Sequence, residues 1–554
     1  MLTDPTIISG TIRSYEGLAQ EYRWRIPERF NIAEAICGRH ARERPDDPSI
    51  IEDDPGGGHR VISFAGLEVL SDRVASGLAR LGIVRGDRVA VTLEQGVDTL
   101  AVHLACFKLG AISVPIASLY GTQGLAYRID DCGARIIITD SVGAAKLASP
   151  NRPTSLEHIV VAGDLHPGSS LTFTELTSAG GPEVGCADTA ADDPAMLFYT
   201  SGTTGPAKGA LHAHRVLIGH LPGFQMVFDL APRRGDVFWT PSAWSWVASL
   251  VELVLPALYF GHPVVATSER FSIQGAYRVL AEHGVTCPFL APAALRRMRT
   301  EPPDPATRFS LRAIMTGGEA SPPEVLEWTR RTLGATVNDI YGQTEANHIA
   351  SGCSALFETP HGAIGRPVVG RRTRIVDAEG KESDPGRSGE ITLWKDDPIV
   401  MLGYWGRPEK TEEKIADGWI RTGDAGYLDE RGFLHFQGRL DDMIMAGGYR
   451  LGPEEIEGAL LAHDAVMEVG VVGLPDPERG EIVAACVRLK SGFEPSDLLA
   501  NELQNFVVQR LAAHARPRRV EFVQSLPATS SGKTQRAALR RLLLENRQSE
   551  KLAP

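Results

Sequence analysis

Residues 199–209 read Tyr199-Thr-Ser-Gly-Thr-Thr-Gly-Pro-Ala-Lys-Gly209, and no other stretch of this 554-residue sequence says more about its chemistry. The stretch follows an apolar run typical of a buried strand and precedes a helical pattern around residues 215–220. Glycines let backbone N–H groups face an anion, while hydroxyl groups and Lys208 add donors and positive charge. We therefore predict a phosphate-binding loop; an exposed Ser/Thr/Gly linker is the alternative. The candidate ligands are Thr200, Ser201, Gly202, Thr203, Thr204, Gly205 and Lys208.

Strand and helix patterns alternate on both sides of this loop. Between residues 67 and 114, helical spacing of leucine and valine alternates with apolar runs and turn signals. Further apolar strands are expected at residues 135–139, 159–161, 195–199 and 286–290. This rhythm predicts an α/β fold with mostly parallel sheets covered by helices, in which ligands collect at the carboxyl ends of the strands.

The pattern changes in the last third of the chain. From about residue 364, short alternating runs separated by Gly, Asp and Pro predict a small β-rich subdomain. After Asp441, helix and strand patterns predict a separate α+β unit. We therefore expect a large multi-lobed N-terminal domain at residues 1–440 and a smaller, mobile C-terminal domain at residues 441–554, because 554 residues exceed one hydrophobic core.

Composition excludes several classes of function. The formal net charge of −12 gives no overall attraction to nucleic acid or to an anionic membrane. The seven cysteines are scattered without a CxxC pair, which predicts neither disulfides nor a zinc site and fits a reducing cytosol. Residues 1–10 lack the features of a signal peptide, and the apolar stretch at residues 246–266 is interrupted by polar residues and proline. We expect a cytoplasmic protein without a membrane span.

The phosphate loop does not have Walker A spacing, which requires two glycines five residues apart with Lys-Ser/Thr after the second. Gly532-Lys533-Thr534 offers a second candidate, but Pro527 occupies the position of the first glycine. The sequence therefore disfavours a P-loop nucleotide hydrolase at both places.

Six segments resemble motifs of the adenylate-forming superfamily, which comprises acyl-CoA synthetases, luciferases and peptide-synthetase adenylation domains. The loop at residues 199–209 resembles its signature sequence. The other five segments, in the expected order, are Gly317-Gly-Glu-Ala320, Asp339-Ile-Tyr-Gly-Gln-Thr-Glu345, Arg421-Thr-Gly-Asp424, Gly438 to Pro453, and Leu526-Pro-Ala-Thr-Ser-Ser-Gly-Lys533. The resemblance is strongest to acyl-CoA synthetases of the acetyl and medium-chain type. It implies that ATP activates a carboxylic acid as its acyl-adenylate and that coenzyme A then accepts the acyl group.

The resemblance also implies roles in the nucleotide site. Attack of a carboxylate on the α-phosphorus of ATP brings two anions together, so cations are needed where charge develops. Lys533 would bridge the carboxylate and the α-phosphate, Lys208 would add charge, and Glu345 would hold Mg²⁺ with Thr204 as a hydroxyl ligand. A non-catalytic binding protein on this fold would be expected to have lost Lys533, Asp424 or Glu345, and all three are present.

Further residues of the motifs would contact adenosine. Asp424 can accept hydrogen bonds from both ribose hydroxyls. Tyr341 would stack on adenine, with a buried core tyrosine as the alternative. Arg439 and Arg450 could reach ribose or phosphate, with surface ion pairs as the alternative. The remaining candidates are Gly318, Glu319, Ala320, Asp339, Gln343 and Thr344.

The segment Gly438 to Pro453 resembles the hinge about which the C-terminal domain of the family turns between its two half-reactions. Asp441 is the hinge candidate. Gly447 and Gly448 would approach the pantetheine arm of CoA, because glycine allows close passage beside the backbone. Met445 stands where the family often has lysine, and the absence of this lysine resembles the acetyl and medium-chain branch. This favours CoA over luciferin or a carrier protein as the partner.

The acid itself is less constrained. Acetate-specific relatives have a tryptophan where this chain has Gly342, so we expect an acid longer or more branched than acetate. The favoured substrates are aliphatic acids of short to medium length. Benzoate-type acids are the alternative, and dicarboxylic acids are disfavoured. The candidate lining is Phe238, Trp239, Trp244, Trp246, Val247, Gly318 and Gly342, with ordinary core packing as the alternative for the tryptophans.

Regulation and assembly follow only from analogy. The spacing of Pro527 and Lys533 resembles that of relatives acetylated on the catalytic lysine, so a lysine acetyltransferase and a deacetylase acting on Lys533 are expected partners. A monomer and a homodimer remain equally open.

Overall fold

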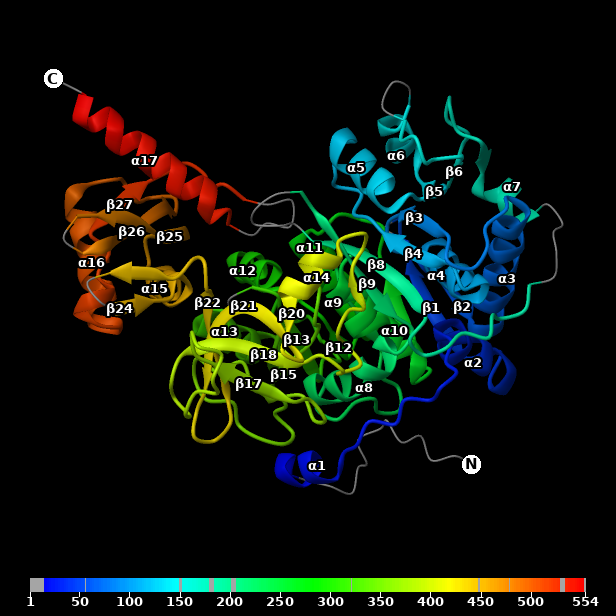
Figure 1. Cartoon of the computed structure of the whole chain (residues 1–554), viewed down its shortest axis with the longest axis horizontal. Coiled ribbons are helices and arrows are strands. Elements are labelled where there is room, and N and C mark those ends of the chain that lie inside the picture. Colours follow the sequence, from blue (N-terminus) through cyan, green and yellow to red (C-terminus); the bar gives the residue numbers. More distant parts are fainter. Residues whose placement is uncertain are drawn as a thin grey trace.

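The structure is a computed structural model of the chain, and it describes residues 14–54, 56–148, 152–178, 184–200, 206–319, 321–446, 449–477, 479–528 and 534–552. These residues form an α/β fold with a large N-terminal domain on mixed sheets and a smaller C-terminal domain on a separate sheet (Figure 1). The predicted fold class is confirmed.

The largest sheet of the N-terminal domain carries the phosphate-loop motif. Its strand order is β19-β9-β8-β4-β3-β5-β6-β7, and the pairs from β8 to β7 are parallel. Its core strands are continuous apolar runs, as expected for strands covered by helices on both faces. The strands are β3 (Arg88–Thr92), β4 (Ile112–Pro115), β5 (Ile136–Thr139), β6 (His158–Val161), β7 (Leu171–Thr172), β8 (Pro194–Thr200), β9 (Lys208–Ala213) and β19 (Gly403–Tyr404).

The phosphate-loop segment connects two antiparallel strands, which corrects the expected order of strand, loop and helix. Strand β8 ends at Thr200, and β9 begins at Lys208 and pairs back against it, with Thr200 opposite Lys208. Helix α8 (Val216–Val227) begins only after β9. The short run at residues 208–213 satisfies its backbone groups by pairing with β8 and β19, so a strand rather than a helix follows the motif.

A second sheet and a third sheet pack beside the first. The strands of the second are β1 (Pro48–Asp53), β2 (His59–Ser63), β10 (Phe238–Trp239), β11 (Val264–Ala266) and β12 (Cys287–Pro288). Those of the third are β13 (Ala313–Gly317), β14 (Thr336–Tyr341), β15 (Ala350–Ser351) and β16 (Arg366–Pro367). The apolar stretch at residues 246–266 forms helices α9 (Val247–Ser249), η2 (Leu250–Val254) and α10 (Leu255–Tyr259) followed by β11, as expected for buried helix and strand. Among the described residues, no helix combines the length and the apolar character that a bilayer crossing requires.

Five strands between residues 373 and 439 form a further, antiparallel sheet. Its strands are β17 (Thr373–Val376), β18 (Gly389–Trp394), β20 (Ile415–Ala416), β21 (Trp419–Leu428) and β22 (Leu434–Arg439). Helix α14 (Pro408–Lys414) leads into β20. Strand β21 lies between β18 and β22, so Asp424 stands opposite Arg439 in the paired register.

The C-terminal domain has its own core. Strands β23 (Ile444–Ala446), β24 (Tyr449–Leu451), β25 (Val466–Asp476), β26 (Gly480–Leu489) and β27 (Arg519–Phe522) form its sheet. Helices α15 (Pro453–Leu461) and α16 (Asp497–Arg510) pack against one another, and α17 (Arg536–Leu552) packs on β25. In Figure 1 this domain stands to one side of the larger body, joined to it after β22.

Candidate active site

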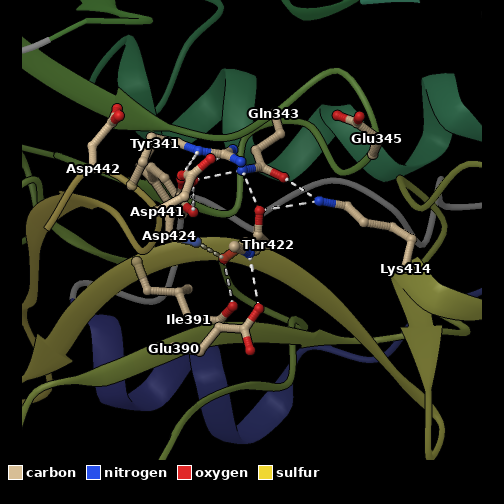
Figure 2. A network of polar contacts seen from close by, with 12 residues as sticks. Tyr341, Gln343, Glu345, Glu390, Ile391, Lys414, Thr422, Asp424, Asp441 and Asp442 are labelled. Atoms are coloured by element: carbon tan, nitrogen blue, oxygen red, sulfur yellow. Dashed lines mark hydrogen bonds and ion pairs between the residues drawn. The ribbon is translucent and has the colours of Figure 1, made fainter. Parts of the chain in front are cut away.

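Two predicted motifs meet at a buried carboxylate, that of Asp424. The hydroxyl of Tyr341, at the end of β14, donates to Asp424 Oδ2 at 2.7 Å. Nε2 of Gln343 donates to the same oxygen at 2.5 Å and to the carbonyl oxygen of Thr422 at 2.9 Å. Segments about eighty residues apart in the sequence thus share one hydrogen-bonded centre (Figure 2).

Asp424 retains capacity to bind a ligand. The residue is 4 % exposed, and its Oδ1 is buried without a hydrogen-bond partner among the described residues. Arg439 Nη1 forms an ion pair with that oxygen at 3.4 Å, too long for a good hydrogen bond. Burial raises the pKa of the Asp424 carboxyl, and Arg439 opposes this effect. A buried acceptor that lacks a donor fits a ligand hydroxyl group, such as those of ribose.

Tyr341 lies in the hydrophobic core rather than on an open face. Its residue exposure is 7 %, and its ring is tilted by 34° against Phe436 with centroids 5.4 Å apart. Burial raises the pKa of its hydroxyl well above the usual value. The ring has the environment of the core tyrosine that the sequence left as an alternative, and its hydroxyl orients Asp424.

A second group of polar residues surrounds Glu345. The Tyr404 hydroxyl, on β19, donates to Glu345 Oε1 at 2.6 Å. Lys208 Nζ lies 4.6 Å from the centroid of the Tyr404 ring. The strand pairing of β9 with β19 therefore places the lysine of the phosphate-loop motif close to the carboxylate of the 339–345 motif.

The fit of a magnesium ion depends on this carboxylate. Within the described parts of the chain, there is no group of three or more His, Cys, Asp or Glu side chains arranged so that it could hold a metal ion. Mg²⁺ commonly uses one or two carboxylates together with substrate phosphates and water. Glu345 therefore fits an ion that is brought by ATP.

The adenine-motif residues lie at the carboxyl ends of neighbouring parallel strands, β13 and β14. Gly317 and Gly318 have φ of +148° and +87°, which glycine adopts without strain. Glu319 pairs with Arg296 at 3.0 Å. The main chain of Thr344 accepts a hydrogen bond from His212 at 2.8 Å.

Asp339 carries a perturbed carboxyl group on β14, because burial raises its pKa to about 7. A folded-state pKa above the unfolded value of about 4 stabilises the fold at low pH, and this contribution is lost as pH rises from about 4 towards 7. We therefore expect the melting temperature of Asp339→Asn, relative to that of the unsubstituted protein, to be higher at the upper end of this pH window than at the lower end. Thermal unfolding without nucleotide at pH 5 and pH 8 measures it. Asp396→Asn, at an exposed carboxylate, is the control, and an equal difference at both pH values would contradict the assignment.

The expected acyl pocket fits the structure only in part. A Cβ built on Gly342 would lie 2.2 Å from the backbone nitrogen of His348 and 2.8 Å from the carbonyl carbon of Asn347. The glycine thus accommodates close backbone packing, and the expectation that its missing side chain opens a cavity is not supported.

The tryptophans divide into two groups. Trp239 and Trp244 are each 2 % exposed and belong to hydrophobic core clusters, as does Phe238. Trp246 and Val247, at the start of α9, are partly exposed. Among these five side chains, Trp246 and Val247 are the more accessible.

Several predicted site residues lie outside the described part of the chain. They are Ser201, Gly202, Thr203, Thr204, Gly205, Ala320, Gly447, Gly448, Lys533 and the side chain of Arg450. Thr200 stands at the end of β8, and Asp441 is exposed and pairs with Arg439 Nε at 3.3 Å.

Sequence analysis missed three contributors to the site: Tyr404, Thr422 and Lys414. The pairing of β19 with β9, whose residues lie nearly two hundred positions apart in the sequence, brings Tyr404 to the site. Thr422 contributes through its main-chain carbonyl oxygen. Lys414 occupies the end of a charged, mostly exposed helix, where a lysine is ordinarily solvated. No local signal in the sequence distinguishes Tyr404 or Lys414, whereas Thr422 lies within the Arg421–Asp424 motif.

The chain matches known families along most of its length. Residues 37–405 match the AMP-binding enzyme family, and residues 455–533 match the AMP-binding enzyme C-terminal domain. Acetyl-coenzyme A synthetase of Bacillus subtilis is 33 % identical over 86 % of this chain and 84 % of its own length. A mitochondrial acyl-coenzyme A synthetase of Rattus norvegicus is 33 % identical over 93 % of this chain and 91 % of its own.

Solved structures show the same fold. An anthranilate CoA ligase in complex with anthranoyl-AMP superimposes with a TM-score of 0.85 at 27 % identity, covering 93 % of this chain and 98 % of the other. The chain therefore belongs to the AMP-binding enzyme family. Within that family it is an acyl-CoA synthetase, an AMP-forming ligase of an acid and coenzyme A.

Proposed function

We propose that the chain joins a carboxylic acid to ATP as an acyl-adenylate with release of pyrophosphate, and then transfers the acyl group to CoA with release of AMP. The observation that carries this proposal is the buried Asp424. Tyr341 and Gln343 hold one of its oxygens, while the other has no hydrogen-bond donor among the described residues. This arrangement suits a ribose diol.

The charged groups of the site suit the adenylation step. Lys208 and a magnesium ion on Glu345 would stabilise the negative charge of the phosphates, with Thr204 as a further metal ligand. Lys533 would lie between the attacking carboxylate and the α-phosphate. Arg439, which pairs with Asp424, would contact ribose when nucleotide binds. Magnesium-dependent activity is part of the proposal.

The second half-reaction needs a different arrangement of the two domains. Strand β22 ends at Arg439, and β23 begins at Ile444 in a separate sheet, so few residues connect the domains. We place the hinge at Asp441 within this connection, with domains at residues 1–440 and 441–554. Rotation there would exchange Lys533 for Gly447 and Gly448 at the reacting carbonyl.

For the acid, we propose a short- to medium-chain or branched aliphatic substrate larger than acetate. Partly exposed Trp246 and Val247 would supply an apolar wall, and the carboxylates and cations described above would serve the nucleotide. An aromatic acid is the second candidate, favoured by the likeness to an anthranilate CoA ligase. The relative named acetyl-coenzyme A synthetase points to acetate instead, so acetate must be among the acids tested.

The substrate proposal is tested by pyrophosphate release with ATP and CoA over a series of acids. The series runs from acetate to octanoate and includes isobutyrate, benzoate, anthranilate and a dicarboxylate. We expect kcat/KM to be at least about 10-fold higher for butyrate, isobutyrate or hexanoate than for acetate, because each buried methylene adds apolar contact. Highest turnover with benzoate or anthranilate would establish the aromatic alternative, and highest turnover with acetate would contradict both candidates.

The cellular setting is proposed from the same sequence features. We propose a cytoplasmic enzyme whose partners are small molecules rather than nucleic acid. Acetylation of Lys533 would remove the charge needed for adenylation and so switch the enzyme off. Mass spectrometry that finds acetylated Lys533 in fully active protein would exclude this control.

A further inference from the structure

Helix α14 ends at a lysine that reaches into the nucleotide site. Lys414 Nζ donates to Gln343 Oε1 at 3.1 Å and to the carbonyl oxygen of Thr422 at 3.0 Å. Figure 2 shows its side chain extending toward these two residues, with Glu345 nearby. The other lysine of the same helix, Lys410, points to solvent and pairs with Glu413.

Lys414 is held by neutral acceptors although carboxylates surround it. Burial lowers the pKa of its ammonium group, and the charges of Glu345 and Asp424 oppose that shift. Among the residues that the structure describes, Nζ has two hydrogen-bond acceptors and no ion pair within 4.0 Å. An ammonium group has three donors, so one N–H remains for a further acceptor.

The contact of Lys414 with Gln343 favours one orientation of the amide, the same orientation in which Nε2 donates to Asp424 and to the carbonyl oxygen of Thr422. The two ends of a glutamine amide are similar in shape but opposite in polarity, and an ammonium group can only donate. With Lys414 on Oε1, Nε2 must face Asp424 Oδ2, as observed at 2.5 Å. If the amide turned over, its oxygen would face the carboxylate and the hydrogen bond would become a repulsion.

Accordingly, we propose that Lys414 is a positioning residue of the ATP site. It fixes the amide of Gln343 so that this amide donates to Asp424, and its charge offsets those of Glu345 and Asp424 where an anionic nucleotide must approach. The inference rests on the proposed nucleotide site at Asp424, and it adds a residue to which neither the sequence motifs nor the comparisons assign a role.

The test compares Lys414→Met with Lys410→Met, a matched change one turn earlier on the same helix. Equilibrium binding of ATP and of AMP is measured by titration calorimetry, which requires no knowledge of the acid. We expect Lys414→Met to weaken binding about 10-fold or more, the loss typical of a hydrogen bond with a charged partner, and Lys410→Met to leave it unchanged. Lys414→Arg, which keeps charge and donors, should retain most of the affinity.

Gln343→Ala tests the route of the effect. If Lys414 acts through the amide of Gln343, adding Lys414→Met to Gln343→Ala should weaken binding clearly less than it does in the unsubstituted protein. The melting temperature of every variant is measured, so that weaker nucleotide binding can be distinguished from loss of folding. Lys414→Gln is included as a second variant that has a neutral side chain. Equal affinity of Lys414→Met and Lys410→Met, or fully additive losses with Gln343→Ala, would overturn the proposal. Absence of nucleotide binding by the unsubstituted protein would overturn the proposed function as well.

Discussion

Asp424→Asn is expected to weaken binding of ATP and AMP by about 100-fold or more. The change replaces two acceptor oxygens by one oxygen and one NH₂ group, next to the Tyr341 hydroxyl and the Gln343 amide that both donate to Asp424 Oδ2. Either one of those donors or the ribose must then lose its acceptor. Hydrogen bonds to a charged group contribute about 1.5–3 kcal/mol each, and two such bonds to ribose correspond to a factor of this size.

Calorimetric titration with AMP measures the effect directly. Asp396→Asn is the control, because it makes the same chemical change at an exposed carboxylate of the same β-rich region. Asp424 is also a buried group, so the melting temperature of each variant is recorded with the affinity. Unchanged AMP affinity in a folded Asp424→Asn protein would place the nucleotide elsewhere.

Lys533→Ala is expected to slow acid-dependent adenylation by about 100-fold or more. Loss of one group that stabilises charge in a transition state commonly costs this much. The proposed hinge carries Lys533 away before the acyl transfer, so transfer from a synthetic acyl-adenylate to CoA should continue in the variant. The two half-reactions are measured separately, by acid-dependent exchange of pyrophosphate into ATP and by thioester formation.

Lys490→Ala provides the control for this substitution, since Lys490 is an exposed lysine of the same domain. Equal loss of both half-reactions in Lys533→Ala would show that the lysine supports folding or a common step. Retention of adenylation would remove Lys533 from the mechanism.

The strands could be predicted from the sequence because their patterns are local. The run at residues 136–139 is apolar at three successive positions, and a buried parallel strand is the structure that such a run favours. The same reasoning failed at residues 208–213. There the short segment after the loop is a strand without a local signal, because its pairing with β19 depends on residues far away in the sequence.

The candidate site was predictable where a motif carries its own chemistry. Charge and motif context single out Asp424, Glu345 and Lys208. The structure brings these three residues into one region, with Tyr341, Gln343 and Tyr404 between them. Gly342 shows the limit of this reasoning. The sequence identifies a missing side chain, whereas only the structure shows that backbone atoms of residues 347–348 occupy the space beside it.

Lys414 illustrates what a sequence pattern does not contain. Its neighbours on α14 are charged and exposed, so its reach toward Gln343 follows from the way this helix packs on β19, β20 and β21. Long-range packing of this kind leaves no periodic signal.

Acyl-adenylate chemistry predicts a definite fate for one oxygen atom. A carboxylate that attacks the α-phosphorus keeps its oxygen in the acyl–O–P bridge, and attack of the CoA thiolate on the carbonyl leaves that oxygen on AMP. The measurement is mass spectrometry of the AMP formed with CoA, ATP and an accepted acid labelled with oxygen-18 in its carboxylate. AMP carrying one heavy oxygen per acyl-CoA formed is the predicted result; unlabelled AMP, or ADP in its place, would contradict the account.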